Sequence, residues 1–297
     1  MFSKNQNRNR RDFFGSASGR KLLETNGLDR FESIWAVNAA WVEEPNYRRQ
    51  GWSGVCRIEL QDEPKALPSG VYLKRQEGHC YRSFRPPFRM RPTAYRECRN
   101  LMKMKALCLA APEVLYYGER RVGSVWQAIL MTREIPQSIS LEAYMRQSSG
   151  RPYAEVKHII TETASLIGRF HRQHLEHGAL YGKHIMIGGF NENPPSAAQP
   201  DRKLAPHLID LEKARLGLAR WLVAVHDLNQ FYRHMPWGAP EWRLFLDQYV
   251  AASGNKWFGL VLTWLIRWKV HRKHVDHRHR NALSLQPLPL KRSSKAI

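Results

Sequence analysis

The change in residue periodicity near residue 132 constrains the fold of this chain more than any other feature. From about residue 35 to residue 75 the sequence has a β pattern, and polar and apolar residues alternate through most of GWSGVCRIEL. One helix is expected over residues 92–110, and a hairpin of two more strands follows it. After Thr132 the pattern is mainly helical, with a long helix expected over residues 152–175. The order predicts an α+β fold with a small β-rich N-lobe and a mainly helical C-lobe.

A strand lysine is followed by a helix glutamate in the β-rich half. Lys74 lies at the end of the apolar run in GVYLKRQ, and Glu97 lies 23 residues later in the helical segment YRECRNLMKMKAL. A lysine that faces a cleft under a sheet needs a carboxylate partner, because an unpaired ammonium is costly to remove from water. Protein kinases use this arrangement. A solvated lysine and an unrelated glutamate would give the same pattern, so that alternative stays open.

The second half supplies two further segments in the order that a kinase requires. His177 and His184 have the spacing of the catalytic-loop pattern H-x-D-x-x-x-x-N, and Asp210 follows the apolar run that begins at His207. Phosphoryl transfer needs positive charge on the phosphates, ligands for Mg²⁺ and a group that orients the acceptor. Four such elements in the correct order are far less expected by chance than any one of them. The sequence therefore predicts a protein-kinase-like fold with two lobes around a nucleotide site.

Five strings of this sequence resemble a known family: VYLKRQ, YRECRNL, APEVLYYG, HGALYGKHIMI and LIDLEKAR. They are similar to the bacterial lipopolysaccharide core kinase family (Kdo/WaaP-like), and within it to the acid-inducible, InaA-like branch. The resemblance covers roughly residues 35–250, and YGKHI and DLEKAR are its most specific parts. It implies a kinase-like fold, ATP and Mg²⁺ as cofactors, sugars of the lipid A–core region as acceptors, and work at the cytoplasmic face of the inner membrane.

The resemblance also assigns roles to individual residues. It implies that Lys74 holds the nucleotide phosphates, that Glu97 pairs with this lysine, and that Asp210 binds Mg²⁺. His184 stands where most kinases have asparagine as a second metal ligand, and the similar sugar kinases tolerate histidine there. His177 would be the structural histidine that braces the catalytic loop.

Three further residues are candidates for the nucleotide pocket. Met131 ends the last strand of the β-rich lobe, and the resemblance places it at the border of the adenine pocket; an ordinary core methionine is the alternative. Gly51 and Gly54 in RRQGWSGV are expected in a turn that covers the phosphates. Two glycines in a hairpin also need no functional explanation.

Ala179 departs from the kinase pattern, because it stands where the catalytic aspartate is expected. Loss of a general base typically costs about 10²–10⁴ in rate. The cost is smaller where positioning and electrostatics dominate, as they do in phosphoryl transfer. His177, Tyr181 and Glu212 are candidates for orienting the acceptor hydroxyl, and the sequence does not rank them. Two interpretations stay open: an active kinase, and a nucleotide-binding pseudokinase of the envelope or acid stress response that transfers no phosphate.

The formal net charge of +21 predicts anionic partners. The sequence lacks helix-turn-helix, zinc-finger, RRM and KH signatures, so nucleic acid is the least favoured of these partners. Lipopolysaccharide core or another anionic glycolipid is favoured, together with ATP. The tryptophan-rich segment 257–270 and the basic tail after it suit the acidic leaflet of the inner membrane, with a core helix as the alternative for 257–270.

Composition divides the chain into four parts. A basic flexible arm is expected over residues 1–30, the N-lobe over 31–133, the C-lobe over 134–270 and a basic flexible tail over 271–297. Histidines recur in the tail, but arginine and lysine lie between them and would repel a metal ion, so the histidines are interpreted as part of a solvated basic segment.

Cysteine spacing and hydropathy predict a cytoplasmic protein. The four cysteines form no C-x-x-C pair, which disfavours both a disulfide scaffold and a zinc site and favours reduced thiols. The N-terminus lacks the apolar core of a secretory signal, and the sequence contains no stretch of about 18 apolar residues that could span a membrane. Peripheral attachment to the cytoplasmic face of the inner membrane remains an alternative.

Overall fold

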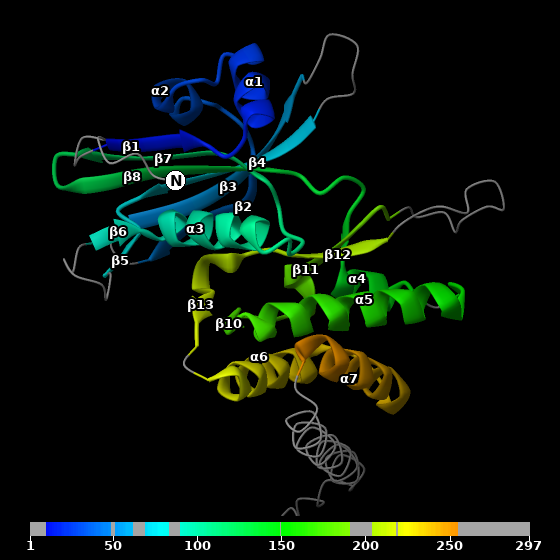
Figure 1. Ribbon diagram of the computed structural model, residues 1–297. Coiled ribbons are helices and arrows are strands. Elements are labelled where there is room, and N and C mark those ends of the chain that lie inside the picture. The colour runs from blue at the N-terminus through cyan, green and yellow to red at the C-terminus, as the bar shows by residue number, and fades with distance from the viewer. Residues whose placement is uncertain are drawn as a thin grey trace, which may run out of the picture.

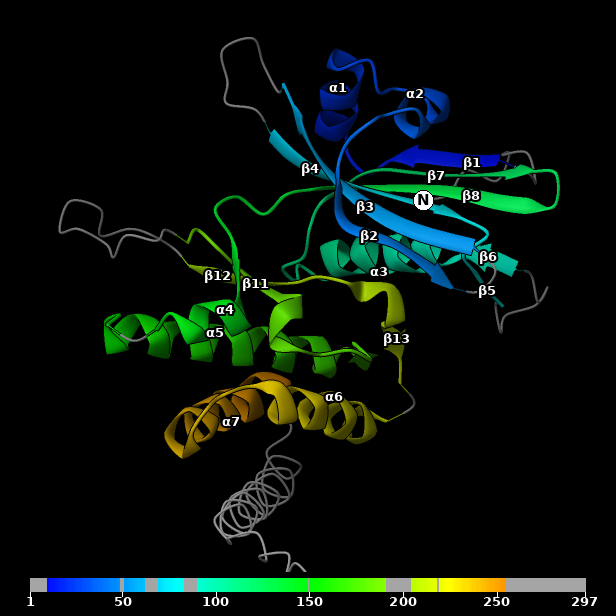
Figure 2. The same cartoon turned by 180° about the vertical axis from the view of Figure 1, so that it is seen from behind.

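The computed structural model describes residues 10–48, 51–61, 69–82, 90–148, 150–190, 204–217 and 219–254. A sheet-rich lobe lies above a helical lobe in Figure 1, and the view from behind shows the same two layers (Figure 2). The predicted α+β fold with two kinase-like lobes is confirmed. The secondary structure changes from mainly strands to mainly helices after residue 133, close to the change in sequence periodicity.

An antiparallel sheet of six strands forms the upper lobe within the described residues. Its spatial order is β1-β7-β8-β4-β3-β2. The strands are β1 (Arg10–Phe14), β2 (Trp41–Arg48), β3 (Gly51–Leu60), β4 (Ser69–Glu77), β7 (Val114–Val122) and β8 (Val125–Arg133). Two short strands, β5 (Cys80–Arg82) and β6 (Met90–Pro92), pair with each other beside this sheet. Side chains alternate between the two faces of a strand, so Leu73 and Lys74 of β4 point to opposite faces.

Two short helices, α1 (Ala17–Thr25) and α2 (Phe31–Trp35), cover the outer face of the sheet (Figure 1). Leu22 and Leu23 of α1 and Phe31 of α2 are fully buried there. They pack in one apolar cluster with Leu73 of β4. Because Leu73 faces this cluster, Lys74 faces the other side of the sheet, toward the helical lobe.

The flexible arm predicted for residues 1–30 is wrong from residue 10 onward. Strand β1 pairs antiparallel with β7, and Phe14 packs edge to face on Tyr116 with ring centroids 5.4 Å apart. Ser16 then caps α1, because its hydroxyl accepts a hydrogen bond from the backbone N–H of Gly19. The composition of this segment is mostly polar, so its few apolar residues gave no pattern. Phe13 and Phe14 pair with Tyr117 and Tyr116, about a hundred residues later in the chain. Residues 1–9 lie outside the described part.

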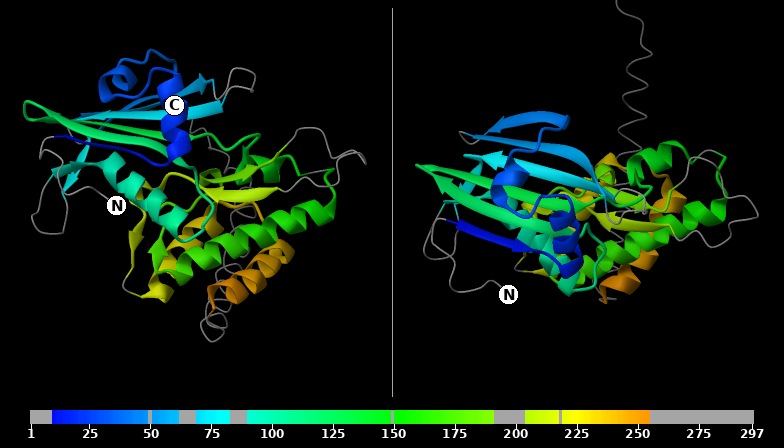
Figure 3. Two further views of the ribbon diagram at one scale, coloured as in Figure 1. Left: turned by 45° about the horizontal axis from the view of Figure 1, so that its top comes forward. Right: turned by 90° about the horizontal axis from the view of Figure 1, so that it is seen from above.

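Helix α3 (Thr93–Ala106) lies on the inner face of the sheet, between the sheet and the helical lobe (Figures 1 and 3). Its buried residues Cys98, Leu101 and Met104 recur at three-residue spacing and line one side of the helix. These side chains belong to a single buried cluster that continues into the helical lobe as far as Tyr249. The two lobes therefore share one apolar core beneath α3.

The lower lobe consists of four helices within the described residues, together with short strands and turns. The helices are α4 (Leu141–Arg146), α5 (Tyr153–Arg172), α6 (Arg220–His234) and α7 (Ala239–Ser253). The remaining elements are β9 (Ile139–Ser140), β10 (Leu175–Glu176), η1 (Gly182–His184), β11 (Ile185–Gly188), β12 (Ala205–Leu208), η2 (Leu211–Lys213) and β13 (Arg215–Leu216). Helices α5 and α7 pack closely because Gly168 has no side chain; a Cβ there would lie 2.7 Å from the Cβ of Ala252.

Several sequence predictions fall on segments outside the described residues. These segments are the basic tail 271–297 and the tryptophan-rich stretch 257–270. The four cysteines carry free thiols, as predicted. Among the residues that are described, none of the helices is long and apolar enough to cross a bilayer.

Candidate active site between the lobes

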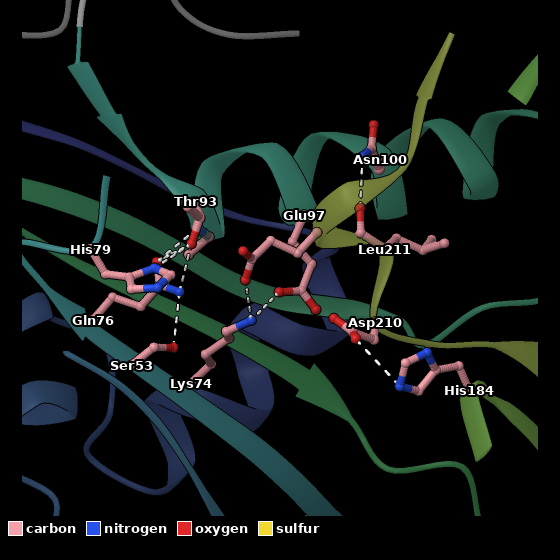
Figure 4. A network of polar contacts seen from close by, with 12 residues as sticks. Ser53, Lys74, Gln76, His79, Thr93, Glu97, Asn100, His184, Asp210 and Leu211 are labelled. Atoms are coloured by element: carbon pink, nitrogen blue, oxygen red, sulfur yellow. Dashed lines mark hydrogen bonds and ion pairs between the residues drawn. The ribbon is translucent and has the colours of Figure 1, made fainter. Parts of the chain in front are cut away.

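Lys74 lies between two carboxylates on the inner face of the sheet. Its Nζ donates to Glu97 Oε2 at 2.6 Å and to Glu212 Oε2 at 3.1 Å (Figure 4). The three side chains are only 15%, 12% and 16% exposed. They come from β4, α3 and η2, so this contact joins three distant segments of the chain. The structure therefore brings Lys74 and Glu97 together and adds Glu212 as a second partner.

The charges around Lys74 set the protonation of the group. Burial alone would lower the pKa of the Lys74 ammonium, but Glu97, Glu212 and Asp210 outweigh burial and raise that pKa above its ordinary value. Burial raises the pKa of Glu97, and the attraction of Lys74 opposes that rise. Burial would also raise the pKa of Glu212, but Lys74 lowers it below its ordinary value. One ammonium thus lies among three carboxyl groups, while Arg96 and His79 also act on Glu212.

Gln76 couples the strand that carries Lys74 to the helix that carries Glu97. Its amide Oε1 accepts a hydrogen bond from the backbone N–H of Ala94 at 2.8 Å, in the first turn of α3. Its Nε2 donates to Ser53 Oγ at 3.0 Å (Figure 4). The residue before α3 supplies no side-chain cap, so Gln76 satisfies one of the free N–H groups at the start of this helix. The glutamine is buried and lies two residues after Lys74, on the same strand face.

Asn100 ties α3 to the turn that follows Asp210. It lies one helical turn after Glu97 and is buried. Its Nδ2 donates to the carbonyl oxygen of Leu211 at 2.8 Å (Figure 4). It also donates to the carbonyl oxygen of Ala214, again at 2.8 Å. A single amide group therefore fixes the position of Glu97 relative to the segment that carries Asp210 and Glu212.

Asp210 is the exposed member of the site. Its backbone has φ 55° and ψ 52°, the left-handed conformation that is uncommon for a residue other than glycine. Its side chain is 44% exposed, and its Oδ2 lies 3.5 Å from Nε2 of His184 (Figure 4). Nδ1 of His184 lies 2.8 Å from the carbonyl oxygen of Ala179. A carbonyl only accepts, so Nδ1 carries the hydrogen and Nε2 faces the Asp210 carboxylate.

His177 and Asp227 hold the loop that contains Ala179. The Asp227 carboxylate accepts from the backbone N–H groups of His177 at 2.6 Å and Gly178 at 3.0 Å. The His177 side chain is buried, and its Nε2 donates to the carbonyl of Ile209 at 3.0 Å. Burial lowers the pKa of His177, although the charge of Asp227 opposes this. His177 is therefore a neutral residue between the loop and the strand end that precedes Asp210.

The remaining predicted pocket residues do not gather at Lys74. Met131 is fully buried in the cluster on the outer face of the sheet, opposite the face of Lys74. The prediction that Met131 borders an adenine pocket beside Lys74 is therefore wrong, and the alternative of a core methionine holds. Gly51 and Gly54 lie on β3, where an added Cβ would approach the backbone of Glu77 to 2.1 Å and the ring of Trp41 to 2.5 Å. Packing explains both glycines, and a phosphate-covering role remains a prediction.

Sequence reasoning missed the three residues that position the site, Gln76, Asn100 and Asp227. Each is a polar residue within an amphipathic segment, and its burial requires hydrogen-bond partners. The polar residue in an amphipathic segment is visible in the sequence. Its hydrogen-bond partners cannot be identified there, because Asn100 and Leu211 lie 111 residues apart and Asp227 and His177 lie 50 residues apart.

A cavity of about 410 Å³ lies on another side of α3. The second half of α3, residues 108–114 and His207 line it, and none of the predicted site residues does. The charges and hydrogen bonds around Lys74, not this cavity, define the candidate active site.

Comparisons with known proteins relate the chain to one family. The profile of the lipopolysaccharide kinase (Kdo/WaaP) family matches residues 32–249. The chain is similar to Protein InaA from Escherichia coli (strain K12), with 28% identity over 226 residues that make up 75% of this chain and 96% of that protein. It is also similar to a solved structure of WaaP in complex with acyl carrier protein, with a TM-score of 0.59 and 19% identity. That match covers 89% of this chain and 97% of the WaaP chain.

Proposed function

Because the chain belongs to the lipopolysaccharide kinase (Kdo/WaaP) family, we propose that it is an ATP-dependent kinase that phosphorylates lipopolysaccharide core sugars or a related envelope saccharide. The observation that carries the proposal is the convergence of Lys74, Glu97 and Asp210 from three distant segments. Glu97 orients the Lys74 ammonium toward the nucleotide phosphates in this proposal. The work would take place on the cytoplasmic face of the inner membrane.

The donor set around Asp210 fits a divalent cation. A carboxylate is a preferred ligand of Mg²⁺, and Asp210 is the exposed carboxylate of the site. The hydrogen on His184 Nδ1 leaves Nε2 as an acceptor that faces Oδ2 of Asp210 at 3.5 Å. Two acceptors at this distance repel each other unless a proton or a cation lies near both. Asp210 and His184 would thus hold the metal, which would neutralise the charge of the phosphates.

The imidazole of His184 also affects which metals are favoured. Imidazole nitrogen suits transition metals better than Mg²⁺, which prefers oxygen. We therefore expect Mn²⁺ to bind this site at least as tightly as Mg²⁺ does. Calorimetric titration of both ions in the presence of a non-hydrolysable ATP analogue measures the order directly.

Burial and contacts favour one of the three candidates for orienting the acceptor hydroxyl. His177 is buried and neutral, so it has no access to an acceptor. Glu212 is bound to Lys74. Tyr181 is half-buried and packs edge to face on His184, with ring centroids 5.6 Å apart. In an active enzyme the Tyr181 hydroxyl would orient the acceptor beside the metal ligands.

Transfer of labelled phosphate from ATP to lipopolysaccharide extract tests this function. Lys74→Ala and Asp210→Ala should each reduce transfer by at least about 10²-fold, because each removes a charge that catalysis by positioning and electrostatics needs. The exposed Lys21→Ala is the matched control and should retain wild-type transfer. Full activity in both site variants would refute the site assignment.

A second candidate function is a nucleotide-binding pseudokinase of the envelope or acid stress response. Ala179 favours it, because this residue occupies the loop position of the catalytic base and its side chain is a buried methyl group. Its backbone carbonyl accepts a hydrogen bond from His184. Thermal stabilisation by Mg·ATP, measured beside phosphate transfer, separates the two functions. Stabilisation without transfer would favour the pseudokinase, and the absence of any nucleotide effect would contradict both.

A further inference from the structure

Three large apolar side chains protrude where β13 leads into α6. Leu216 is 58% exposed, Trp221 is 54% exposed and Leu222 is 49% exposed. The next residue, Val223, is buried, so α6 turns its apolar inner face to the core and leaves Trp221 and Leu222 outside. We call the described residues 213–217 and 219–222 the β13–α6 corner; they lie at one side of the helical lobe in Figure 1. Folding leaves these apolar groups in water, which costs free energy unless another surface covers them.

The charged side chains of this corner are cations. Lys213, Arg215 and Arg220 are all exposed. The acidic groups nearest in sequence are directed elsewhere: Glu212 binds Lys74, and Asp227 binds the backbone of the 177–178 loop. An anionic surface that approaches the corner therefore meets positive charge around an apolar centre.

Among the residues that the structure describes, Glu176 is the acidic side chain with hydrogen bonds to the corner. It is 7% exposed and accepts two hydrogen bonds from Arg215, at 2.9 and 3.0 Å. His226 lies on the other side of the same carboxylate, with Nδ1 2.8 Å from Oε1. Arg215 and His226 therefore both contact the buried Glu176 carboxylate. The Arg215 side chain itself remains 68% exposed.

The corner is held in place before any partner arrives. Gly217 packs directly on Val223, where an added Cβ would lie 2.1 Å from Cγ2. The backbone N–H of Gly217 donates to the carbonyl of His174 at 2.8 Å. Strand β13 pairs with β10 through Leu216 and Leu175. The exposed apolar groups thus stand on a braced turn, and little ordering entropy is lost when the corner binds.

We propose that the β13–α6 corner docks on a bilayer surface that carries anionic headgroups, with Trp221 and Leu222 in the interfacial region and the cations against the headgroups. Tryptophan favours the membrane–water interface, and arginine and lysine side chains reach from it to the phosphates. Each cation near an acidic surface contributes favourably, and the contribution decreases with added salt. A stable protein partner would need about 800 Å² from each side, more than three protruding side chains offer.

The position of the corner connects it to the candidate active site. Asp210 lies six residues before Leu216, and the segment between them is the one that Asn100 anchors. Docking of the corner would bring the exposed Asp210 side of the site near the headgroups. This part of the inference rests on the proposed function, since it would present the site to a membrane-bound glycolipid acceptor.

Sedimentation of the full chain with vesicles tests the docking. We expect binding to phosphatidylcholine vesicles in which roughly one lipid in three is phosphatidylglycerol, and weak binding to phosphatidylcholine alone. Replacing both Trp221 and Leu222 by serine should weaken binding by about tenfold or more. Tyr153→Ser is the matched control, because Tyr153 is 72% exposed on α5 and should contribute nothing. Equal binding by the corner variant and wild type, or an equal loss in the control, would overturn the proposal.

A local probe separates this corner from other basic parts of the chain. Cys108 is the exposed thiol and is first changed to serine, because the other three cysteines are buried. An environment-sensitive fluorophore on Leu222→Cys should shift its emission to shorter wavelength with anionic vesicles, and the same label on Tyr153→Cys should not. No shift at 222 would refute the docking even if the protein sediments. Mg·ATP binding of these variants without vesicles tests the nucleotide site separately, so a failure of the proposed function is recognised independently.

Discussion

The two halves of the candidate site differ in how completely their charges are paired. On the side of Lys74, hydrogen bonds of 2.6 and 3.1 Å join side chains that are less than a fifth exposed. On the side of Asp210, the ion pair with His184 is longer, 3.5 Å, and the aspartate is 44% exposed. The ammonium half is closed and preorganised, while the aspartate half is open.

This difference matches what each half would have to do in the proposed reaction. An ammonium that waits for phosphates must be held in place without losing its charge, and buried carboxylates achieve this. A metal ligand and an acceptor site must remain accessible to groups that arrive from solvent. The open half also contains the departure from the kinase pattern, Ala179, so the two halves can be tested separately.

The largest expected effect comes from restoring the missing acid in the open half. Ala179→Asp should raise phosphate transfer by about 10²–10⁴-fold if the protein lacks only its general base. Ala179→Asn is the matched control, because it has the same size and cannot accept a proton, and it should give no gain. Initial rates with lipopolysaccharide extract measure both variants. The same rate in both variants would mean that another group orients the acceptor hydroxyl. A substitution of Tyr181 would then be tested next.

The next effect concerns the frame behind the open half. Asp227→Ala leaves two backbone N–H groups and His171 without their carboxylate, so we expect a loss of about 3–5 kcal/mol in the free energy of unfolding. Urea unfolding near neutral pH measures this loss. The exposed Asp247→Ala on α7 is the control and should change little. A loss below 1 kcal/mol, roughly the range of an exposed pair, would show that the loop does not depend on Asp227.

A smaller effect is expected at the tether between the two halves. Asn100→Asp replaces the donor with a carboxylate that faces two carbonyl oxygens, which should cost about 1–3 kcal/mol of stability. Backbone amides over residues 210–215 should exchange with deuterium faster, and Mg·ATP should bind more weakly.

Asn26→Asp provides the matched control for this tether. Asn26 also donates to two carbonyl oxygens, of Leu22 and Gln61, but on the far face of the sheet. It should lose less stability, because this site is partly exposed, with no change in nucleotide affinity or in exchange at 210–215. If both variants weakened nucleotide binding equally, Asn100 would be a general stabilising residue and not a positioning one.

The smallest effect is a difference in pH dependence between the halves. Burial lowers the pKa of His177 and of His207, so the unfolded chain takes up protons near pH 6.5 that the folded chain does not. Stability should therefore fall as the pH falls, by at most about 0.7 kcal/mol for each histidine between about pH 7 and pH 6. The Lys74 ammonium itself should contribute no pH dependence in this range, because its raised pKa affects stability only as the pH rises above about 10.

Thermal melts across this pH range check the assignment. His207→Gln should reduce the pH slope of stability relative to wild type. An identical slope in wild type and His207→Gln would contradict a contribution from this half-buried imidazole.

Much of the fold and part of the site followed from local pattern. The strand that carries Lys74, the helix that carries Glu97 and the long helix α5 could be predicted because side-chain periodicity records which face of an element is buried. The N-terminal strand and helix were missed, because residues 10–30 are polar in composition and their few apolar side chains acquire meaning only against β7. Met131 was misplaced because strand alternation, not position at the end of β8, decides which face a side chain joins.

The sequence by itself determined the kinds of charge that the protein would use and the order in which they occur along the chain. Only the tertiary structure decided that Glu212 shares Lys74 with Glu97, that Asn100 and Asp227 hold the two loops, and that Trp221 stays outside the core. The physical reason is that periodicity is a local property, whereas a buried polar group is satisfied by whichever distant segment the packing of the core brings within hydrogen-bonding distance.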